Sequence, residues 1–331
     1  MNLIIADTLS EKGHFYLNLL IINWLNDFGF TCRGFFSREF SEKVKTVKCN
    51  CFEEKYLKKG FMLRYFFNQL LLHCKLLLLA RKNKSDLLLL SYEIYSFSIF
   101  SYVYSVFGVK VFVIEHNTVP TVTSSMKGML YRSISNSVCH LSLESYISEF
   151  IRDNYSKRTC FFEHPILLDD SVSENTATNI DSTNKKPYYF MPSSTVNYTI
   201  ANEIIESFKS KEDSILFMKN IGESVGPNIF KMDFFEDYYN LLKNSKIIIL
   251  PQLFDYRVSG VFYETLPFDN IVVMYDCIMA RELYSKYPNK IQIVNSASQI
   301  TSLTFKTLTS KVDVISYNEN SKKQLLDCLH G

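Results

Sequence analysis

Residues 257–264 carry the side chains in this sequence that are best suited to hold an anion. The segment reads Arg-Val-Ser-Gly-Val-Phe-Tyr-Glu and follows an isoleucine-rich run, residues 246–250, typical of a strand buried on both faces of a parallel sheet. Ser259 and Gly260 stand at an expected helix start, where a hydroxyl and unpaired backbone N–H groups would face a phosphate. Glu264, about one turn further on, can accept hydrogen bonds from two ribose hydroxyls. The spacing indicates a nucleotide site; alternatively, Ser259 only caps the helix, Gly260 allows close packing and Glu264 faces water.

A histidine follows another apolar run. Residues 109–114 read as a buried strand and are followed by Glu115, His116 and Asn117. A histidine at the end of a buried strand can carry a proton near neutral pH or donate a hydrogen bond to a sugar hydroxyl. The commoner case is a histidine satisfied within the structure. Among the histidines of this chain, His116 is our candidate for a catalytic residue.

Other polar residues also follow predicted strands. Ser193 and Ser194 lie in a loop whose small side chains leave backbone N–H groups accessible to a phosphate. Lys219 ends another apolar run, and either Lys219 or Arg257 can place a cation on a diphosphate, a contact worth about 1.5 to 3 kcal/mol.

The elements that must position these residues alternate between strand and helix patterns, which favours parallel α/β sheets with ligands at the carboxyl ends of the strands. Strands are predicted at residues 3–6, 86–90, 109–114, 138–143, 159–162, 188–191, 215–218, 228–232, 246–250, 271–274, 290–294 and 312–316. Helices are predicted at residues 17–28, 95–107, 144–155, 201–210, 234–243, 261–266, 279–284, 297–308 and 321–329.

Length and composition predict two domains. The chain has 331 residues, 47% of them hydrophobic, which is enough for two cores. Residues 169–186 are polar, rich in Ser, Thr and Asn, and lack aromatic residues, as an exposed linker would. We therefore expect domains at 1–168 and 187–331.

The cysteines and the apolar runs indicate in which part of the cell the protein is expected. The eight cysteines form no C-x-x-C pair and show no spacing suited to zinc, so we expect a reduced, cytoplasmic protein. The first residues lack the pattern of a signal peptide, and charged residues interrupt every apolar run before it reaches about 20 residues, so no transmembrane helix is predicted.

Charge is unevenly distributed along the chain. Residues 1–150 contain 17 Lys and Arg against 12 Asp and Glu, whereas residues 151–331 contain 19 against 22. Residues 55–84 combine basic side chains with many Leu and Phe, which suits contact with an anionic membrane surface, such as the inner face of a plasma membrane. The alternative is a core helix with a solvated basic edge. A nucleic-acid partner is not expected, because no RNA- or DNA-binding module is present.

The segment 257–264, followed by Ile271-Val272-Val273, resembles the donor-binding segment of GT-B glycosyltransferases. In the retaining, family 4-like group of bacterial polysaccharide-biosynthesis enzymes this segment reads R-x-S-G-x-x-x-E-A before a G-K-P-V-I strand. This sequence has Thr265 in place of the Ala, and Phe-Asp-Asn at 268–270 in place of Gly-Lys-Pro. It also has Tyr256 where the family often has a glutamate that grips the donor sugar.

The resemblance implies a GT-B fold, in which two Rossmann-like domains face each other across a cleft. It implies that the helix start formed by Arg257, Val258, Ser259, Gly260 and Val261 holds the nucleotide diphosphate and that Glu264 holds the ribose. It places His116 toward the donor sugar, and Gly13, His14 and Asn117 on the acceptor side. It also implies that the last helix leans back on the first domain.

The implied function is transfer of a sugar from a nucleotide-diphosphate-sugar donor to a carbohydrate or lipid-linked acceptor, as in O-antigen or capsule assembly. The resemblance favours retention of the anomeric configuration. No cofactor or metal is expected, because the D-x-D motif of the other major glycosyltransferase fold is absent. Two alternatives remain: a GT-B-shaped binding or scaffold protein without turnover, and a sugar-nucleotide epimerase of the same build.

Overall fold

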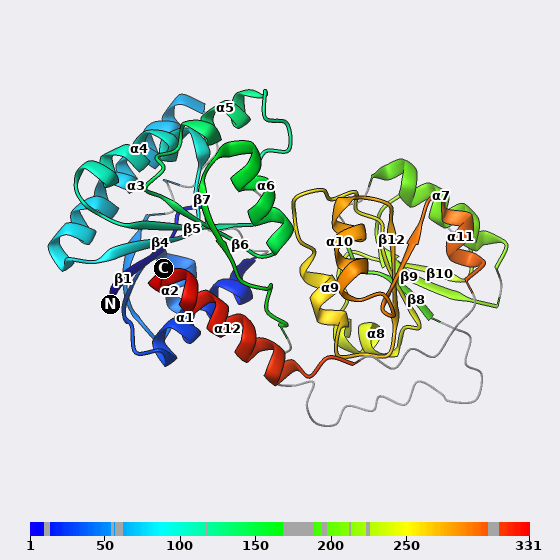
Figure 1. Cartoon of the computed structure of the whole chain (residues 1–331). Coiled ribbons are helices and arrows are strands. Elements are labelled where there is room, and N and C mark those ends of the chain that lie inside the picture. The colour runs from blue at the N-terminus through cyan, green and yellow to red at the C-terminus, as the bar shows by residue number, and fades with distance from the viewer. Residues whose placement is uncertain are drawn as a thin grey trace. The chain divides into compact units, whose positions relative to one another are not determined.

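The chain folds into two compact units (Figure 1). The structure is a computed structural model that describes residues 1–9, 14–53, 56, 62–116, 118–167, 188–193, 197–211, 213–222, 226–303 and 311–331. Unit 1 comprises Met1–Pro165 and Glu319–Gly331, and unit 2 comprises Ile166–Asn318. The tail of the predicted second domain, 187–331, thus belongs to unit 1. The predicted linker, 169–186, lies outside the described residues.

Unit 1 is built on a seven-stranded parallel sheet with the order β3-β2-β1-β4-β5-β6-β7. Its strands are β1 (Asn2–Asp7), β2 (Thr31–Ser37), β3 (Lys48–Phe52), β4 (Asp86–Ser91), β5 (Val111–Glu115), β6 (Cys139–Ser142) and β7 (Arg158–Phe161). The chain moves outward from β1 to β3 in one direction and from β4 to β7 in the other. The order therefore reverses between β1 and β4, and the carboxyl ends of these strands border the switch point.

Helices cover both faces of this sheet. They are α1 (Phe15–Asp27), α2 (Arg38–Lys43), α3 (Met62–Asn83), α4 (Ile94–Val106), α5 (Met126–Ser133), α6 (Ser145–Tyr155) and, from residue 319 on, α12 (Val314–His330). The helices α3, α4 and α5 lie on one side, and α1 and α12 lie on the other (Figure 1). Local sequence sets their ends: Gly29 takes a positive φ of 73° after α1, and the Glu93 carboxylate accepts hydrogen bonds from two N–H groups at the start of α4.

Unit 2 contains a six-stranded parallel sheet with the order β10-β9-β8-β11-β12-β13. Its strands are β8 (Tyr188–Met191), β9 (Ile215–Lys219), β10 (Ile229–Met232), β11 (Ile247–Leu250), β12 (Ile271–Tyr275) and β13 (Ile291–Val294). Its helices are α7 (Tyr198–Lys209), α8 (Tyr238–Asn244), α9 (Gly260–Thr265), α10 (Ile278–Lys286) and α11 (Ala297–Thr301). The apolar residues of α7 and α11 pack on one face of the sheet to form a core. Here the order reverses between β8 and β11.

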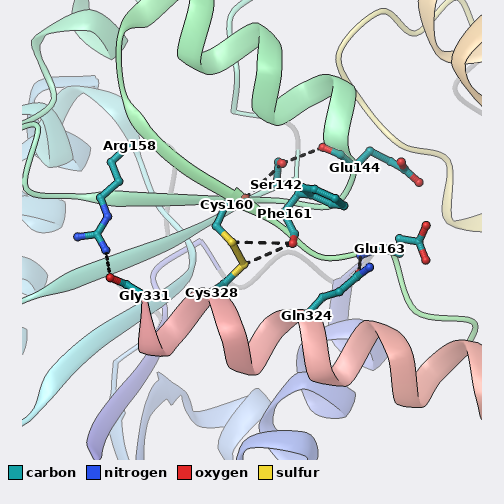
Figure 2. Close-up of a disulfide and its surroundings, with 9 residues drawn as sticks. All are labelled: Ser142, Glu144, Arg158, Cys160, Phe161, Glu163, Gln324, Cys328 and Gly331. Atoms are coloured by element: carbon teal, nitrogen blue, oxygen red, sulfur yellow. Dashed lines mark hydrogen bonds between the residues drawn. A yellow bond between two sulfur atoms is a disulfide. The ribbon is translucent and has the colours of Figure 1, made fainter.

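The tail is attached to unit 1 by a disulfide and hydrogen bonds. Cys160 in β7 and Cys328 in α12 form the disulfide, with Cα atoms 5.7 Å apart (Figure 2). Arg158 Nη2 donates to the Gly331 carbonyl oxygen at 2.5 Å, and Gln324 Oε1 accepts from the Glu163 N–H at 2.8 Å. The prediction that every cysteine is reduced is therefore wrong for this pair. The other six cysteines are free thiols.

Every predicted strand except one is present. Residues 312–316 are not a strand, because α12 begins at Val314 and the Asp313 carboxylate accepts a hydrogen bond from the Ser316 N–H at 2.7 Å, as a helix cap does. The strands β2 and β3 were not predicted. Both lie toward one edge of the sheet, where polar residues such as Arg33 and Asn50 interrupt the apolar pattern.

Residues 62–83 form the amphipathic helix α3, whose buried side includes Leu72, His73, Leu76 and Ala80. The core-helix alternative is thus correct for this side, and residues 57–61 lie outside the described part of the chain. Among the described residues, no helix is both long and apolar enough to cross a bilayer.

Candidate functional site

Two groups of donor candidates in unit 2, Ser193 and the segment 257–264, lie next to the switch point of its sheet. Ser193 follows β8, and the loop 251–259 leads from β11 into α9. Because β8 and β11 are neighbours at the reversal of strand order, these two segments flank the position where open α/β sheets bind ligands. Thr265 and Asn270 are structural: Thr265 is fully buried, and Asn270 donates to the Leu242 carbonyl at 2.9 Å.

Ser259 is the residue that precedes α9. It has an extended backbone, and its side chain makes no capping hydrogen bond. The alternative in which Ser259 serves only as a side-chain cap is therefore not supported. The Ser259 carbonyl accepts from the Phe262 N–H at 3.0 Å, which fixes the first turn. Ser259 is buried, whereas Val258, Gly260 and Val261 are partly exposed.

Glu264 lies on α9 beside the start of α8. The Tyr238 hydroxyl donates to Glu264 Oε2 at 2.5 Å. Burial raises the pKa of Glu264 from its ordinary value of 4.5 to about 7, and the hydrogen bond from Tyr238 acts in the opposite direction. Burial, together with the nearby Glu264 carboxylate, raises the pKa of Tyr238 well above its ordinary range, so Tyr238 stays a donor. The alternative in which Glu264 simply faces water is therefore wrong.

The two candidate cations differ in environment. Lys219 Nζ donates to the Asp233 carbonyl at 2.7 Å and lies 4.8 Å from the centre of the Phe235 ring. Its charge is therefore already engaged beside the end of β10, two strands beyond β8. Arg257 is exposed in the loop before α9. The structure thus brings Arg257, rather than Lys219, into the same segment as Ser259 and Gly260.

His14 and His116 meet at the carboxyl-end edge of the unit 1 sheet. Their rings stack with centroids 4.3 Å apart and planes inclined by 25°. His14 immediately precedes α1, which follows β1, and His116 immediately follows β5. His14 is partly exposed, whereas His116 is only 8% exposed. The two residues that the sequence assigned to acceptor binding and catalysis are therefore in direct contact.

His116 is held in its neutral form. Burial lowers its pKa well below the ordinary value of 6.5, and the neighbouring His14 and His164 lower it further. His116 Nε2 is buried and has no hydrogen-bond partner among the described residues. A proton carrier with a pKa near neutrality is therefore not supported. The arrangement suits a neutral imidazole that exchanges a hydrogen bond with a ligand.

His164, a third histidine near this edge, is also neutral. Burial is the main reason that its pKa falls to about 4, and its Nδ1 lies 2.8 Å from the Pro165 carbonyl oxygen. The sequence suggested no role for it beyond the turn at which the chain leaves the first domain. In the structure, unit 1 is interrupted at Pro165, the next residue.

Glu115 anchors the strand that carries His116. Its Oε1 accepts hydrogen bonds from the Tyr92 hydroxyl at 2.8 Å, the Tyr131 hydroxyl at 2.9 Å and His140 Nδ1 at 2.6 Å. The Thr118 hydroxyl donates to Oε2. Since Glu115 is only 1% exposed, it does not line a binding site, and its network fixes the end of β5.

A second network joins the ends of β1 and β4 to α1. Asp7, at the end of β1, accepts hydrogen bonds from Asn18 Nδ2 at 3.0 Å and from the Ser91 hydroxyl at the end of β4. The Thr8 hydroxyl donates to the Ser91 carbonyl at 3.1 Å. These contacts join both sides of the switch point. The sequence reasoning missed them because it assigned no role to the polar ends of β1 and β4.

Three predicted site residues, Gly13, Asn117 and Ser194, lie outside the described part of the chain. Within the part that is described, no group of three or more His, Cys, Asp or Glu side chains is arranged to hold a metal ion.

The chain has a GT-B fold, as expected: two parallel, Rossmann-like sheets of seven and six strands. Solved structures similar to it include Anabaena Alr3699/HepE in complex with UDP-glucose, with a TM-score of 0.67 and 11% identity, over 99% of this chain and 100% of that one. A glycosyltransferase from Rickettsia africae ESF-5 matches with a TM-score of 0.66 and 13% identity, over 98% of this chain and 93% of that one. MurG of Acinetobacter baumannii matches with a TM-score of 0.55 and 12% identity, over 99% of both chains. No protein-family model and no curated protein matches the sequence.

Proposed function

We propose that this protein transfers a sugar from a nucleotide-diphosphate-sugar donor to a carbohydrate or lipid-linked acceptor. The observation that carries the proposal is the placement of Ser193, Ser259-Gly260 and Glu264 around the switch point of the unit 2 sheet. The likeness of the whole chain to solved glycosyltransferases supports it, as does the fact that one similar structure contains UDP-glucose.

Unit 2 supplies the donor site. The first turn of α9, with the unused Ser259 hydroxyl and the exposed Arg257, would receive the diphosphate. The Glu264 carboxylate, oriented by Tyr238, would accept hydrogen bonds from the ribose. Each carboxylate oxygen can accept two hydrogen bonds, so the contact with Tyr238 leaves capacity for two hydroxyls. Ser193 and Ser194 complete the proposed donor set.

Unit 1 supplies His116 and the acceptor residues. In the reaction, the bond between the anomeric carbon and the diphosphate breaks, and a bond from the same carbon to an acceptor oxygen forms. The proton of the acceptor hydroxyl passes to a phosphate oxygen of the departing nucleoside diphosphate. A neutral His116 would contribute by hydrogen bonding to the transferred sugar, and His14, with Gly13 and Asn117, would contact the acceptor.

The finer features of the proposal come from the resemblance of residues 257–264 to the retaining bacterial group. They are assembly of a surface polysaccharide such as O-antigen or capsule, retention of the anomeric configuration, and catalysis without a metal ion. Proton NMR of the first-formed product distinguishes retention from inversion, and turnover in the presence of EDTA tests the independence from metal.

One observation favours a second candidate, a binding protein without turnover. The charge of Lys219 is engaged by the Asp233 carbonyl and the Phe235 ring, so that, of the two candidate cations, Arg257 is the one that lies in the segment leading into α9. A leaving diphosphate needs charge stabilisation, so weak neutralisation would permit binding without reaction.

A two-stage experiment tests the proposal. Calorimetric titration with UDP and GDP measures nucleotide binding, and a panel of sugar nucleotides is then incubated with and without acceptor glycans while the released nucleotide is quantified. Release of nucleoside diphosphate supports transfer or donor hydrolysis. Binding without release supports the scaffold alternative, and the absence of any binding contradicts both.

The cytoplasmic location is part of the same proposal, and the Cys160–Cys328 disulfide bears on it because thiols in the cytoplasm are normally kept reduced. Trapping the thiols of intact cells with an alkylating reagent, followed by mass spectrometry of the tail peptide, tests this part. Reduced Cys160 and Cys328 support a cytoplasmic protein, and an intact disulfide in cells contradicts it.

A further inference from the structure

One side of unit 1 exposes an unusual amount of apolar surface. Eleven of the twenty-one large hydrophobic side chains that are exposed in the described structure lie between residues 63 and 129. They are Leu63, Phe67, Leu71, Leu78, Ile99, Tyr102, Val106, Phe107, Val122, Met126 and Met129. Ten of them lie on α3, α4 and α5 or on the residue that ends α4, so we call this surface the α3–α5 face (Figure 1). Single exposed apolar residues are common, but a contiguous group indicates an interaction site.

The apolar residues of α3 form one stripe. Leu63, Phe67, Leu71 and Leu78 fall within an arc of about 80° on a helix that turns 100° per residue, and each is more than half exposed. The buried residues of α3, such as Leu72 and Leu76, lie on the opposite side. Packing against the sheet therefore accounts for one side of α3 and leaves the stripe without a partner in the described structure.

The neighbouring helices continue this surface. Ile99, Tyr102 and Val106 are spaced for one side of α4, and Val106 is 82% exposed. Met126 and Met129 likewise lie on one side of α5, and their side chains are 60% and 57% exposed. Because α4 packs against both α3 and α5, the three apolar stripes belong to adjacent helices.

The charges on these helices have a single sign. The helices contain no Asp or Glu, and their six basic residues, Arg64, Lys75, Arg81, Lys82, Lys127 and Arg132, are all exposed. Arg64, Lys75 and Lys82 border the apolar stripe of α3 on one side. The Arg81 guanidinium lies 4.8 Å from the centre of the Phe107 ring, at the junction of α3 and α4. The face thus combines apolar side chains with a basic border.

We propose that the α3–α5 face docks on an anionic lipid bilayer, with its apolar stripes in the acyl-chain boundary and its basic residues at the headgroups. Long basic side chains next to an apolar stripe suit this depth, since their stems stay among apolar groups while their charges reach the phosphates. A second copy of the chain fits less well. A twofold contact would set six positive charges against six, with no acidic residue on these helices to offset them.

Sedimentation of the full-length protein with vesicles tests the docking. One vesicle set contains about 30 mol% phosphatidylglycerol in phosphatidylcholine and the other contains phosphatidylcholine alone, both in about 0.1 M salt and without any nucleotide. The protein is expected to sediment with the anionic vesicles and to stay in solution with the neutral ones. Because no donor or acceptor is present, the result does not depend on sugar transfer.

Matched double variants locate the contact. Leu71→Glu with Leu78→Glu, and separately Arg64→Glu with Lys82→Glu, should each lower the vesicle partition coefficient about tenfold or more. The control, Lys243→Glu with Lys323→Glu, makes the same charge change as the Arg64→Glu and Lys82→Glu variant, at two exposed lysines outside α3–α5, and should bind like the unmodified protein. All these side chains are exposed, and circular dichroism verifies that each variant is folded.

Three results would overturn the proposal. They are failure of the unmodified protein to bind anionic vesicles, equal loss of binding in the control variant, and unchanged binding in both α3–α5 variants. Light scattering after size exclusion is run on the same samples. A concentration-dependent dimer that the Leu71→Glu and Leu78→Glu variant abolishes, without vesicle binding, would assign the face to a second copy of the chain.

Discussion

The Tyr238 hydroxyl donates a 2.5 Å hydrogen bond to Glu264, which joins the start of α8 to the last turn of α9. The partly buried carboxyl group has a pKa raised to about 7, so its charge changes across the physiological pH range. The proposed ribose site is therefore sensitive to pH in a way that an exposed glutamate would not be. Two predictions follow from this contact.

Nucleotide affinity should rise with pH. The ionised carboxylate of Glu264 accepts hydrogen bonds from ribose hydroxyls better than the protonated acid does. UDP affinity should therefore increase about tenfold between pH 6 and 8 and then level off.

The contribution of Glu264 to the stability of the free protein should decrease with rising pH. A carboxyl whose pKa is raised by folding contributes stability that is fully present below its ordinary pKa of 4.5 and is lost as the pH rises through about 7.

Calorimetric titration with UDP at several pH values measures the pH dependence of nucleotide affinity. Glu264→Ala should weaken binding at pH 8, and Glu264→Gln should remove the pH dependence. Glu282→Gln changes an exposed carboxyl of α10 and serves as the control. Unchanged affinity in Glu264→Ala would reject the ribose role.

Tyr238→Phe should shift the same titration to higher pH. The hydroxyl stabilises the ionised form of Glu264, so its removal raises the pKa of Glu264 further. We expect UDP affinity at pH 7 to fall by about threefold to tenfold and to recover in part at pH 8.5. An affinity that falls equally at all pH values would indicate loss of packing rather than loss of the hydrogen bond.

His116→Ala should depress turnover while nucleotide affinity changes little, because His116 belongs to unit 1 and the nucleotide residues belong to unit 2. A loss of about a hundredfold in kcat is expected for a group that hydrogen bonds in the transition state. Steady-state kinetics and UDP titration separate the two effects. His330→Ala, an exposed histidine of α12, is the control, and normal turnover in His116→Ala would remove that residue from the site.

Glu115→Gln should destabilise unit 1. The carboxylate accepts hydrogen bonds from Tyr92, Tyr131, His140 and Thr118 in a buried position, and an amide presents an N–H₂ group to some of these donors. The expected loss is roughly 2 to 4 kcal/mol. Urea unfolding followed by the fluorescence of the single tryptophan, the buried Trp24 of α1, reports on this unit. Glu149→Gln, at an exposed site of α6, should leave the midpoint unchanged.

Reduction should destabilise unit 1 through the Cys160–Cys328 pair. Dithiothreitol should lower the free energy of unfolding by roughly 2 to 4 kcal/mol, since the disulfide limits the freedom of the unfolded chain. Cys328→Ser should show the lower stability with and without reductant, and Cys51→Ser, at an exposed free thiol, should behave like the unmodified protein. Alkylation of eight thiols rather than six in the unreduced, denatured protein would contradict the pairing.

The central strands could be predicted from the sequence, and the contacts between distant residues could not. Residues 188–191 and the isoleucine run of β11 are buried on both faces, so their composition alone indicates a strand. Residues 312–316 look similar, but the capping carboxylate of Asp313 starts a helix there. Local pattern therefore succeeds where burial is uniform and fails where one side-chain hydrogen bond selects the conformation.

The candidate site shows the same division. The segment 257–264 and His116 were recognisable because each follows a predicted strand. The pairing of Glu264 with Tyr238 depends on how α8 and α9 pack, and the stacking of His14 on His116 joins residues about a hundred positions apart. Such pairs arise from the strand order of the sheets, which the pattern of apolar residues does not specify.

The chain enters unit 2 at Ile166 and leaves it at Asn318, and these two residues bind each other reciprocally: Asn318 Oδ1 accepts from the Ile166 N–H at 2.9 Å, and Asn318 Nδ2 donates to the Ile166 carbonyl at 3.0 Å. The two ends of this lobe therefore coincide. In genetic terms, unit 2 is an insertion within the coding sequence of unit 1, and it could be exchanged for a homologous lobe without changing the path of the chain in unit 1.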